Sequence, residues 1–198
     1  KAGGYRFVLD RDTRSTVLND QKIQVVGFVI DADSPAGETS DPSCRRRWDS
    51  FRNGVLYAAN LQGVQTGLDD LRKLDPPEEG FIADLAQPFN KRVGLWIMPD
   101  NRSSGMLENI LWECAADNDL GKHVVEATDK AKSHGATIPA VHLIKAYVHC
   151  LLAWQPDPGK PYGIAIQSGY LDPSSSTSAA RFHKWCDRLF RQRRDQSS

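Results

Sequence analysis

The sequence predicts an α/β fold in which helices flank a mostly parallel sheet and the C-terminal half is helical. The apolar run at 22–30 is rich in β-branched residues and too continuous for a strand with one wet face, which predicts a doubly covered strand. A second strong strand is predicted at 92–98. Helical periodicity lies between these strands and dominates the chain after them. This order of elements is typical of a parallel α/β core.

Composition limits the class of protein. The chain has 198 residues, a formal net charge of +0 and 40% hydrophobic residues, which suits a single domain. We expect its core at about 1–117 and a helical part at about 118–198. No apolar run approaches the roughly 18 residues of a membrane span. The balanced charge argues against strong non-specific DNA binding by the chain as a whole.

The cysteines indicate the compartment. Four cysteines are scattered through the chain without a close Cys-x-x-Cys pair. This spacing favours reduced thiols in a cytoplasmic protein over a disulfide framework or a zinc site.

The first half of the chain contains further predicted elements. Residues 5–10 predict a short strand, and the Ser-, Pro- and Gly-rich segment 34–43 predicts a loop. A helix is predicted from Cys44 to about Gly63, with an apolar face formed by Trp48, Phe51, Val55 and Ala59. Residues 65–87 predict mostly loop, with a short strand at "FIADLA".

The second half predicts successive helices. The first begins after Ser104, a candidate N-cap, and the next two lie at 119–135 and 138–155. Residues 164–176 predict irregular structure or a short strand, and a terminal helix follows. We expect Trp154 and Trp185 in the core.

Acidic residues follow both strong strands. Asp31 and Asp33 end the first, and Asp100 follows the second, with Glu108 one helical turn into the next helix. In parallel α/β sheets, sites gather beyond the carboxyl ends of the strands. Two carboxylates on the same side of an extended strand attract a hard cation such as Mg²⁺. The alternative is a turn and a helix cap that happen to be acidic.

Basic residues could supply phosphate contacts. His142, Lys145 and His149 lie at helical spacing on one face, so Lys145 and His149 could line a groove that faces phosphate. A partly buried polar stripe explains the same spacing. Arg102, beside Asp100, is a further candidate phosphate contact.

The chain resembles Toprim-fold proteins. A β-branched strand ending in Asp-x-Asp, here "FVIDAD", is a hallmark of that fold, which topoisomerases, bacterial primases and the OLD-family (overcoming lysogenization defect) nucleases share. More narrowly, the chain resembles a family of small stand-alone Toprim-like proteins of unknown function. The matching stretches also include "RRWDSFRN", "RVGLWIMPDNRSSGMLENIL", "IKAYVHCLLAWQPDPGKPYGIAI" and "YLD".

The resemblance implies metal-dependent phosphodiester chemistry on nucleic acid, most simply that of a nuclease. It implies Asp31, Asp33 and Asp100 as ligands of Mg²⁺ or Mn²⁺, and Asp31, Asp33 and Glu108 as catalytic residues. One departure stands out. The family pattern begins with a glutamate on an earlier strand, and the resemblance places that glutamate upstream of Lys1. The loop 34–43 is also longer than the family's short link.

Two other hypotheses remain open. The chain could be a catalytically inactive Toprim module that binds nucleic acid or a partner protein, as a homo-oligomer or within a larger assembly such as a defence system. It could also be a nucleotide hydrolase of the haloacid-dehalogenase type, in which the first Asp is a nucleophile. The later Lys and Asp-Asp signals of that class are not evident.

Overall fold

The computed structural model describes most of the chain, and its elements form a mixed α/β fold. The described residues are 17, 18, 20–32, 43–61, 69–73, 75–87, 89–115 and 119–191. The strand predicted at 5–10 and the loop predicted at 34–43 lie almost entirely outside them. The strands are β1 (Val25–Asp31), β2 (Phe81–Leu85) and β3 (Lys91–Met98). The α-helices are α3 (Ser43–Leu61), α4 (Leu107–Glu113), α5 (Asp119–Ser133), α6 (Leu143–Ala153), α7 (Tyr162–Gln167) and α8 (Thr177–Phe190), with 3₁₀ turns η1 (Asp69–Arg72), η2 (Ala140–His142) and η3 (Pro173–Ser175).

The described sheet combines a parallel and an antiparallel pair. Its order is β1-β3-β2. β1 and β3 run parallel in continuous register from Val25↔Arg92 to Asp31↔Met98, whereas β2 and β3 run antiparallel. Parallel strands need a long crossover, which α3 supplies between β1 and β3. The link from β2 to β3 is far too short for a crossover, so these two strands form a hairpin. The prediction of a mostly parallel sheet therefore holds only for the β1–β3 pair.

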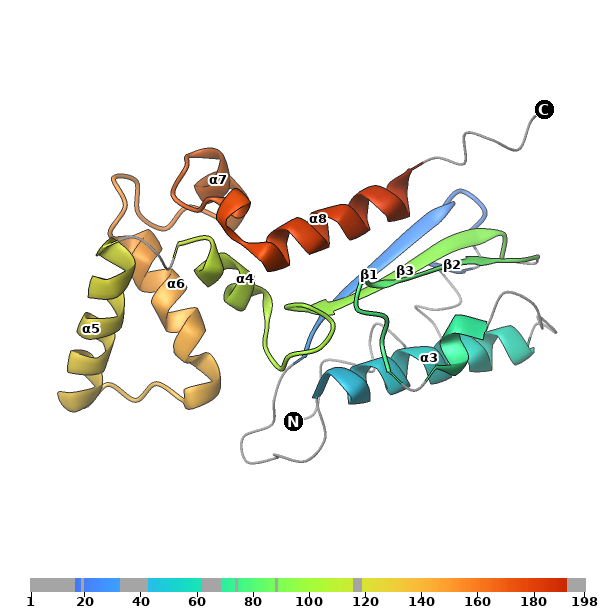
Figure 1. Ribbon diagram of the computed structural model, residues 1–198, viewed down its shortest axis with the longest axis horizontal. Coiled ribbons are helices and arrows are strands. Elements are labelled where there is room, and N and C mark those ends of the chain that lie inside the picture. Colours follow the sequence, from blue (N-terminus) through green and yellow to red (C-terminus); the bar gives the residue numbers. More distant parts are fainter. Residues whose placement is uncertain are drawn as a thin grey trace.

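Helices cover both faces of the sheet (Figure 1). α3 lies against one face and α8 against the other. β3 is the central strand, and alternate residues along it enter the two cores: Val93 and Leu95 face α3, while Trp96 and Met98 belong to the core on the α8 side. β1 is at the edge of the described sheet, and Val29 is 47% exposed. The predicted double coverage is thus realised by β3 rather than along all of β1.

The predicted apolar face of α3 forms the first core. Trp48, Phe51 and Val55 are buried, as predicted from their helical spacing. The ring of Phe51 meets Phe28 of β1 and Phe81 of β2 edge to face, at centroid distances of 5.6 and 5.8 Å. One helix thereby contacts both outer strands of the described sheet.

α8 comes unusually close to the sheet because glycines lie beneath it. Gly27 and Gly94 are paired across β1 and β3. A Cβ atom at Gly94 would lie 2.8 Å from Leu189 and 2.9 Å from Trp185, and one at Gly27 would lie 2.9 Å from Leu189. Both side chains of α8 are buried, at 0% and 1% exposure. The two glycines therefore allow the side chains of α8 to pack directly against the backbone of the sheet.

Helices α4 to α7 lie beyond the carboxyl ends of β1 and β3 (Figure 1). α6 packs between α4 and α5, and its residues Val148, Leu151 and Leu152 are buried with Val124 of α5. Within the described ranges, no helix has the length and apolar character that crossing a membrane requires.

Three local predictions are wrong. Met106, rather than Ser104, is the N-cap of α4, and the side chain of Asn109 accepts a hydrogen bond from its backbone N–H. The segment predicted to be irregular or a strand overlaps the short helix α7. Trp154 is 46% exposed instead of buried, because it follows the last turn of α6.

Candidate functional site

The carboxyl ends of β1 and β3 meet at one edge of the sheet. Asp31 is paired with Met98, and the next backbone N–H, of Ala32, donates to the Met98 carbonyl. The Ala32 carbonyl accepts from Gly105 N–H and from the Ser43 hydroxyl at the start of α3. The end of β1 is therefore fixed by β3, by the loop after β3 and by α3.

Asp31 connects this edge to α4. Its Oδ1 accepts a hydrogen bond from the backbone N–H of Leu107, the first residue of α4, over 3.1 Å. The first N–H groups of a helix have no partner within it, so a carboxylate here satisfies one of them. The backbone carbonyl of Asp31 also accepts from Nε of Arg47 at 3.2 Å. The side chain is partly buried. Asp33, its predicted companion, lies outside the described residues.

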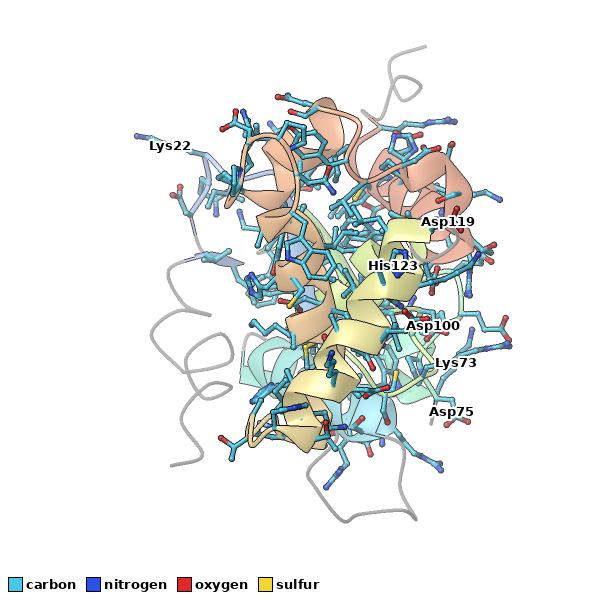
Figure 2. All side chains as sticks on the ribbon, turned by 90° about the vertical axis from the view of Figure 1, so that its left-hand side faces the viewer. Lys22, Lys73, Asp75, Asp100, Asp119 and His123 are labelled. Carbon is cyan, nitrogen blue, oxygen red and sulfur yellow. The ribbon has the colours of Figure 1, made fainter. Side chains whose placement is uncertain are left out.

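Asp100 organises the loop after β3. Its Oδ1 accepts from the backbone N–H groups of Arg102 and Ser103, and its Oδ2 accepts from the Ser103 hydroxyl. Figure 2 shows Asp100 on the same side of the molecule as Lys73 and Asp75. Burial raises the pKa of the neighbouring Cys44 thiol to about 12, and the charges of Asp100 and Asp75 add to this rise. Cys44 is consequently a neutral thiol.

Asn101 holds the same loop from inside. It is 2% exposed and has a positive φ of 64°. Its side-chain oxygen accepts from Ile97 N–H at 2.8 Å, and its amide nitrogen donates to the Glu78 carbonyl. Asn tolerates this left-handed conformation better than most residues, so the Pro-Asp-Asn order is a signal that sequence reasoning could have used.

Glu108 is the centre of a polar cluster that includes two predicted phosphate contacts. It is only 6% exposed. Its Oε1 lies 3.3 Å from the ammonium of Lys145 on α6 and accepts a hydrogen bond of 3.1 Å from the hydroxyl of Tyr162 on α7. Nε2 of His149 lies 3.5 Å from the same hydroxyl. α4, α6 and α7 each contribute to this Glu108 cluster.

Tyr162 was not among the predicted site residues. Burial raises its pKa to about 12, with a further contribution from the negative charge of Glu108, which also accepts its hydrogen bond. The hydroxyl therefore remains a hydrogen-bond donor throughout the neutral range. No local sequence pattern connects Tyr162 to Glu108, since the two residues are 54 positions apart.

Arg102 lies in the loop after β3 and is paired with Glu78. Its side chain is 57% exposed, so this pair faces solvent. A phosphate would compete with Glu78 for the guanidinium.

The predicted acids do not form one compact cluster. Within the described ranges, no three His, Cys, Asp or Glu side chains converge closely enough to hold a metal ion together. Asp31 faces the start of α4, Asp100 is held in its own turn, and Glu108 is directed to Lys145 and Tyr162. The four cysteines are all unpaired thiols, as their spacing predicted.

Comparison with known protein families identifies the family of the chain. It matches the family described as "Protein of unknown function (DUF3226)" over residues 1–191. The chain belongs to the DUF3226 family. No curated protein and no solved structure matches it. Membership covers nearly the whole chain, so both the sheet edge and the Glu108 cluster lie within the family's shared region.

Proposed function

We propose that the carboxyl edge of β1 and β3 is a Toprim-like site for divalent-metal-dependent phosphodiester chemistry on nucleic acid, most simply hydrolysis. The observation that carries the proposal is the parallel register of the two strands, which brings Asp31 and the loop of Asp100 to one edge. Edges of this kind are the usual place of ligand sites in α/β proteins. The likeness to Toprim proteins supports the chemistry by analogy of fold.

The donor atoms at this edge suit Mg²⁺ or Mn²⁺ in type. Magnesium prefers oxygen ligands and commonly takes one or two carboxylates, with water and substrate phosphates completing its shell. Asp31 supplies one carboxylate, and we assign the others to Asp33 and Asp100. A bound Mg²⁺ would polarise a phosphate oxygen and lower the pKa of a coordinated water. The hydrogen bond from Leu107 N–H orients the Asp31 carboxylate at this edge.

The Glu108 cluster would receive the nucleic acid beside the metal. Lys145 is 48% exposed, and His149 is exposed, so both can reach a phosphate from α6. Glu108 keeps the ammonium of Lys145 in position, while its own carboxylate stays buried. We assign to Glu108 the role of positioning the Lys145 ammonium. Glu108 would then affect catalysis through Lys145.

A cleavage assay tests the proposal. Wild-type protein should cleave single- or double-stranded DNA or RNA with Mn²⁺ or Mg²⁺, and Asp31→Asn should lower the rate by at least about a hundredfold. The amide oxygen of Asn can still accept from Leu107 N–H, so this hydrogen bond to the start of α4 is retained. Asp119→Asn is the matched control, because that side chain is 91% exposed on α5. Equal cleavage by wild type and Asp31→Asn would overturn the proposal.

One observation favours a second candidate, a catalytically inactive module that binds nucleic acid or a partner protein. Each described acid of the site already serves the fold: Asp31 at the start of α4, Asp100 in its turn and Glu108 in its cluster. This candidate predicts nucleic-acid binding without cleavage. It also predicts that Asp31→Asn leaves binding unchanged, whereas Lys145→Met weakens it.

A further inference from the structure

A cavity lies at the opposite end of the sheet from the acidic edge. Its volume is about 430 Å³, within the range of small-ligand sites. It is lined by residues just before and at the start of β1, by the last part of β2, by the first residues of β3, and by the end of α8. The register of β1 and β3 separates the two places: the pair Val25↔Arg92 lies beside the cavity, and the pair Asp31↔Met98 lies at the acidic edge. The cavity is therefore a separate feature from the proposed metal site.

The charge around this amino-end cavity favours an anion. Three of its lining residues are basic (Lys91, Arg92 and Arg191), and one is acidic, Asp84. Arg92 is fixed by two bonds to the Asp84 carboxylate and one to the Arg191 carbonyl. A guanidinium has five N–H groups, so two remain for a ligand. Because Arg92 is already held in place, little side-chain entropy is lost when it binds an anion.

Lys91 adds a buried positive charge beside the cavity. It is only 3% exposed, and its ammonium donates to the backbone carbonyls of Asp20 and Ile23. Among the described residues, it forms no ion pair with a carboxylate. Buried charges are normally paired, because a low dielectric makes an uncompensated charge costly. An anion in the neighbouring cavity would provide that compensation.

The remaining lining suits a flat ring with polar edges. Phe190 is 58% exposed although it is a large apolar side chain, and Val25 lies in the same lining. An exposed aromatic ring is a stacking surface for a nucleobase. Side-chain amides can donate to and accept from base edges, and the lining contains three of them: Gln21, Gln24 and Asn90.

We propose that the amino-end cavity binds a nucleotide with a terminal phosphate, with the phosphate toward Arg92 and the base against Phe190. The proposal stands independently of the metal chemistry at the other end of the sheet. A free mononucleotide and the 5′-phosphorylated end of a strand present the same chemical group, so both belong to this ligand class.

Isothermal titration and NMR chemical-shift mapping test the proposal on the full chain. AMP, GMP, CMP and UMP are titrated against adenosine and inorganic phosphate, together with a 5′-phosphorylated dinucleotide that distinguishes a strand end from a free mononucleotide. We expect a phosphorylated nucleotide to bind at least about tenfold more tightly than adenosine or phosphate alone. The shifts should map to residues 21–25, 90–92 and 190–191.

Two variants sharpen the test. Phe190→Ala should weaken nucleotide binding about tenfold, whereas Trp154→Ala, at a 46% exposed aromatic that does not line the cavity, should leave it unchanged. The double variant Asp84→Asn, Arg92→Gln keeps a polar pair across the strands and should also weaken binding. The proposal is overturned if inorganic phosphate binds as tightly as the nucleotides, if no nucleotide binds at millimolar concentration, or if Phe190→Ala binds as well as wild type.

Discussion

The carboxylate of Glu108 illustrates how one side chain constrains three helices. It is the only buried acidic residue in the described part of the chain. Its two partners, Lys145 and Tyr162, come from α6 and α7. A buried carboxylate must keep its partners, because an unsatisfied charge inside a protein is costly. Residues that resemble a catalytic cluster can therefore also determine how the helices pack.

The first prediction concerns the cation of this pair. Lys145→Met removes the ammonium while keeping most of the side-chain volume, which leaves Glu108 with Tyr162 alone. We expect the free energy of unfolding to fall by about 1–2 kcal/mol, measured by urea denaturation. Lys122→Met is the control, since Lys122 pairs with an Asp119 that is 91% exposed, and it should change stability by less than about 0.5 kcal/mol. Equal effects of the two substitutions would contradict the prediction.

The second prediction concerns alkaline pH. The folded protein raises the pKa of Tyr162 to about 12, above the roughly 10 of an unfolded chain. Between these two values the folded state retains a proton that the unfolded state has lost, so stability falls as pH rises. Below pH 10 both states are protonated and the contribution is constant. Urea denaturation at pH 9 and pH 11 should show a smaller loss of stability for Tyr162→Phe than for wild type.

At the scale of elements, the placement of α8 depends on the lack of side chains at two glycines of the sheet. Gly27 and Gly94 lie side by side in the sheet, and the side chains of Trp185 and Leu189 fill the space that Cβ atoms would occupy. Glycine usually weakens a strand. Here it permits close packing of a helix on the sheet, which explains why both glycines fall inside strands.

The third prediction tests this packing of α8 on the glycine pair. Gly94→Ala places a Cβ atom within 3 Å of Leu189 and Trp185, so α8 must shift, and we expect a loss of about 1–3 kcal/mol in unfolding free energy. Gly163→Ala in α7 is the matched control, because no atom lies within 4 Å of the added Cβ and Ala favours a helix. Thermal and urea denaturation should show Gly163→Ala to be neutral or stabilising. A neutral Gly94→Ala would contradict the packing.

Elements with a long periodic pattern could be predicted from the sequence, and short elements could not. The apolar positions of α3 repeat over several turns, which predicted both the helix and its buried face. α7 has six residues, too few for a helical period to emerge from "YGIAIQ". The antiparallel direction of β2 depends on the short link to β3, and recognising "FIADLA" as a strand does not reveal it.

The candidate site likewise has local features that the sequence predicts and long-range contacts that it does not. The position of Asp31 at a strand end follows from local sequence, and so does the turn around Asp100. The contact of Glu108 with Lys145 and Tyr162 depends on how α4, α6 and α7 pack. The amino-end cavity depends on where α8 ends relative to β1. Such long-range contacts leave no local pattern in a single sequence.

At the scale of the whole molecule, β3 joins two hydrophobic cores. Val93 and Leu95 belong to the core under α3, whereas Trp96 and Met98 belong to the larger core that includes α4, α6 and α8. A strand that contributes to both cores cannot lose its packing on one side without disturbing the other. The sheet and the helices beyond its carboxyl ends should therefore unfold together.

The fourth prediction follows from this shared strand. Urea unfolding monitored by far-UV circular dichroism and by tryptophan fluorescence should give coincident transitions, as expected for a single cooperative unit. Trp96→Phe should shift both transitions equally toward lower urea. Separate midpoints for the two probes would show that the helical end unfolds independently of the sheet.

The position of α8 also bears on how the chain folds during synthesis. α8 covers one face of the sheet, and the described strands of that sheet all lie before residue 99, so α8 is synthesised about eighty residues after them. Until residues 177–190 leave the ribosome, the glycine-lined face lacks the packing of α8. Domains tend to fold as units, and exposed apolar surface invites aggregation in the meantime. Completion of the fold is thus tied to a segment translated well after the described strands, and a chain truncated before α8 would lack the helix that packs on this face.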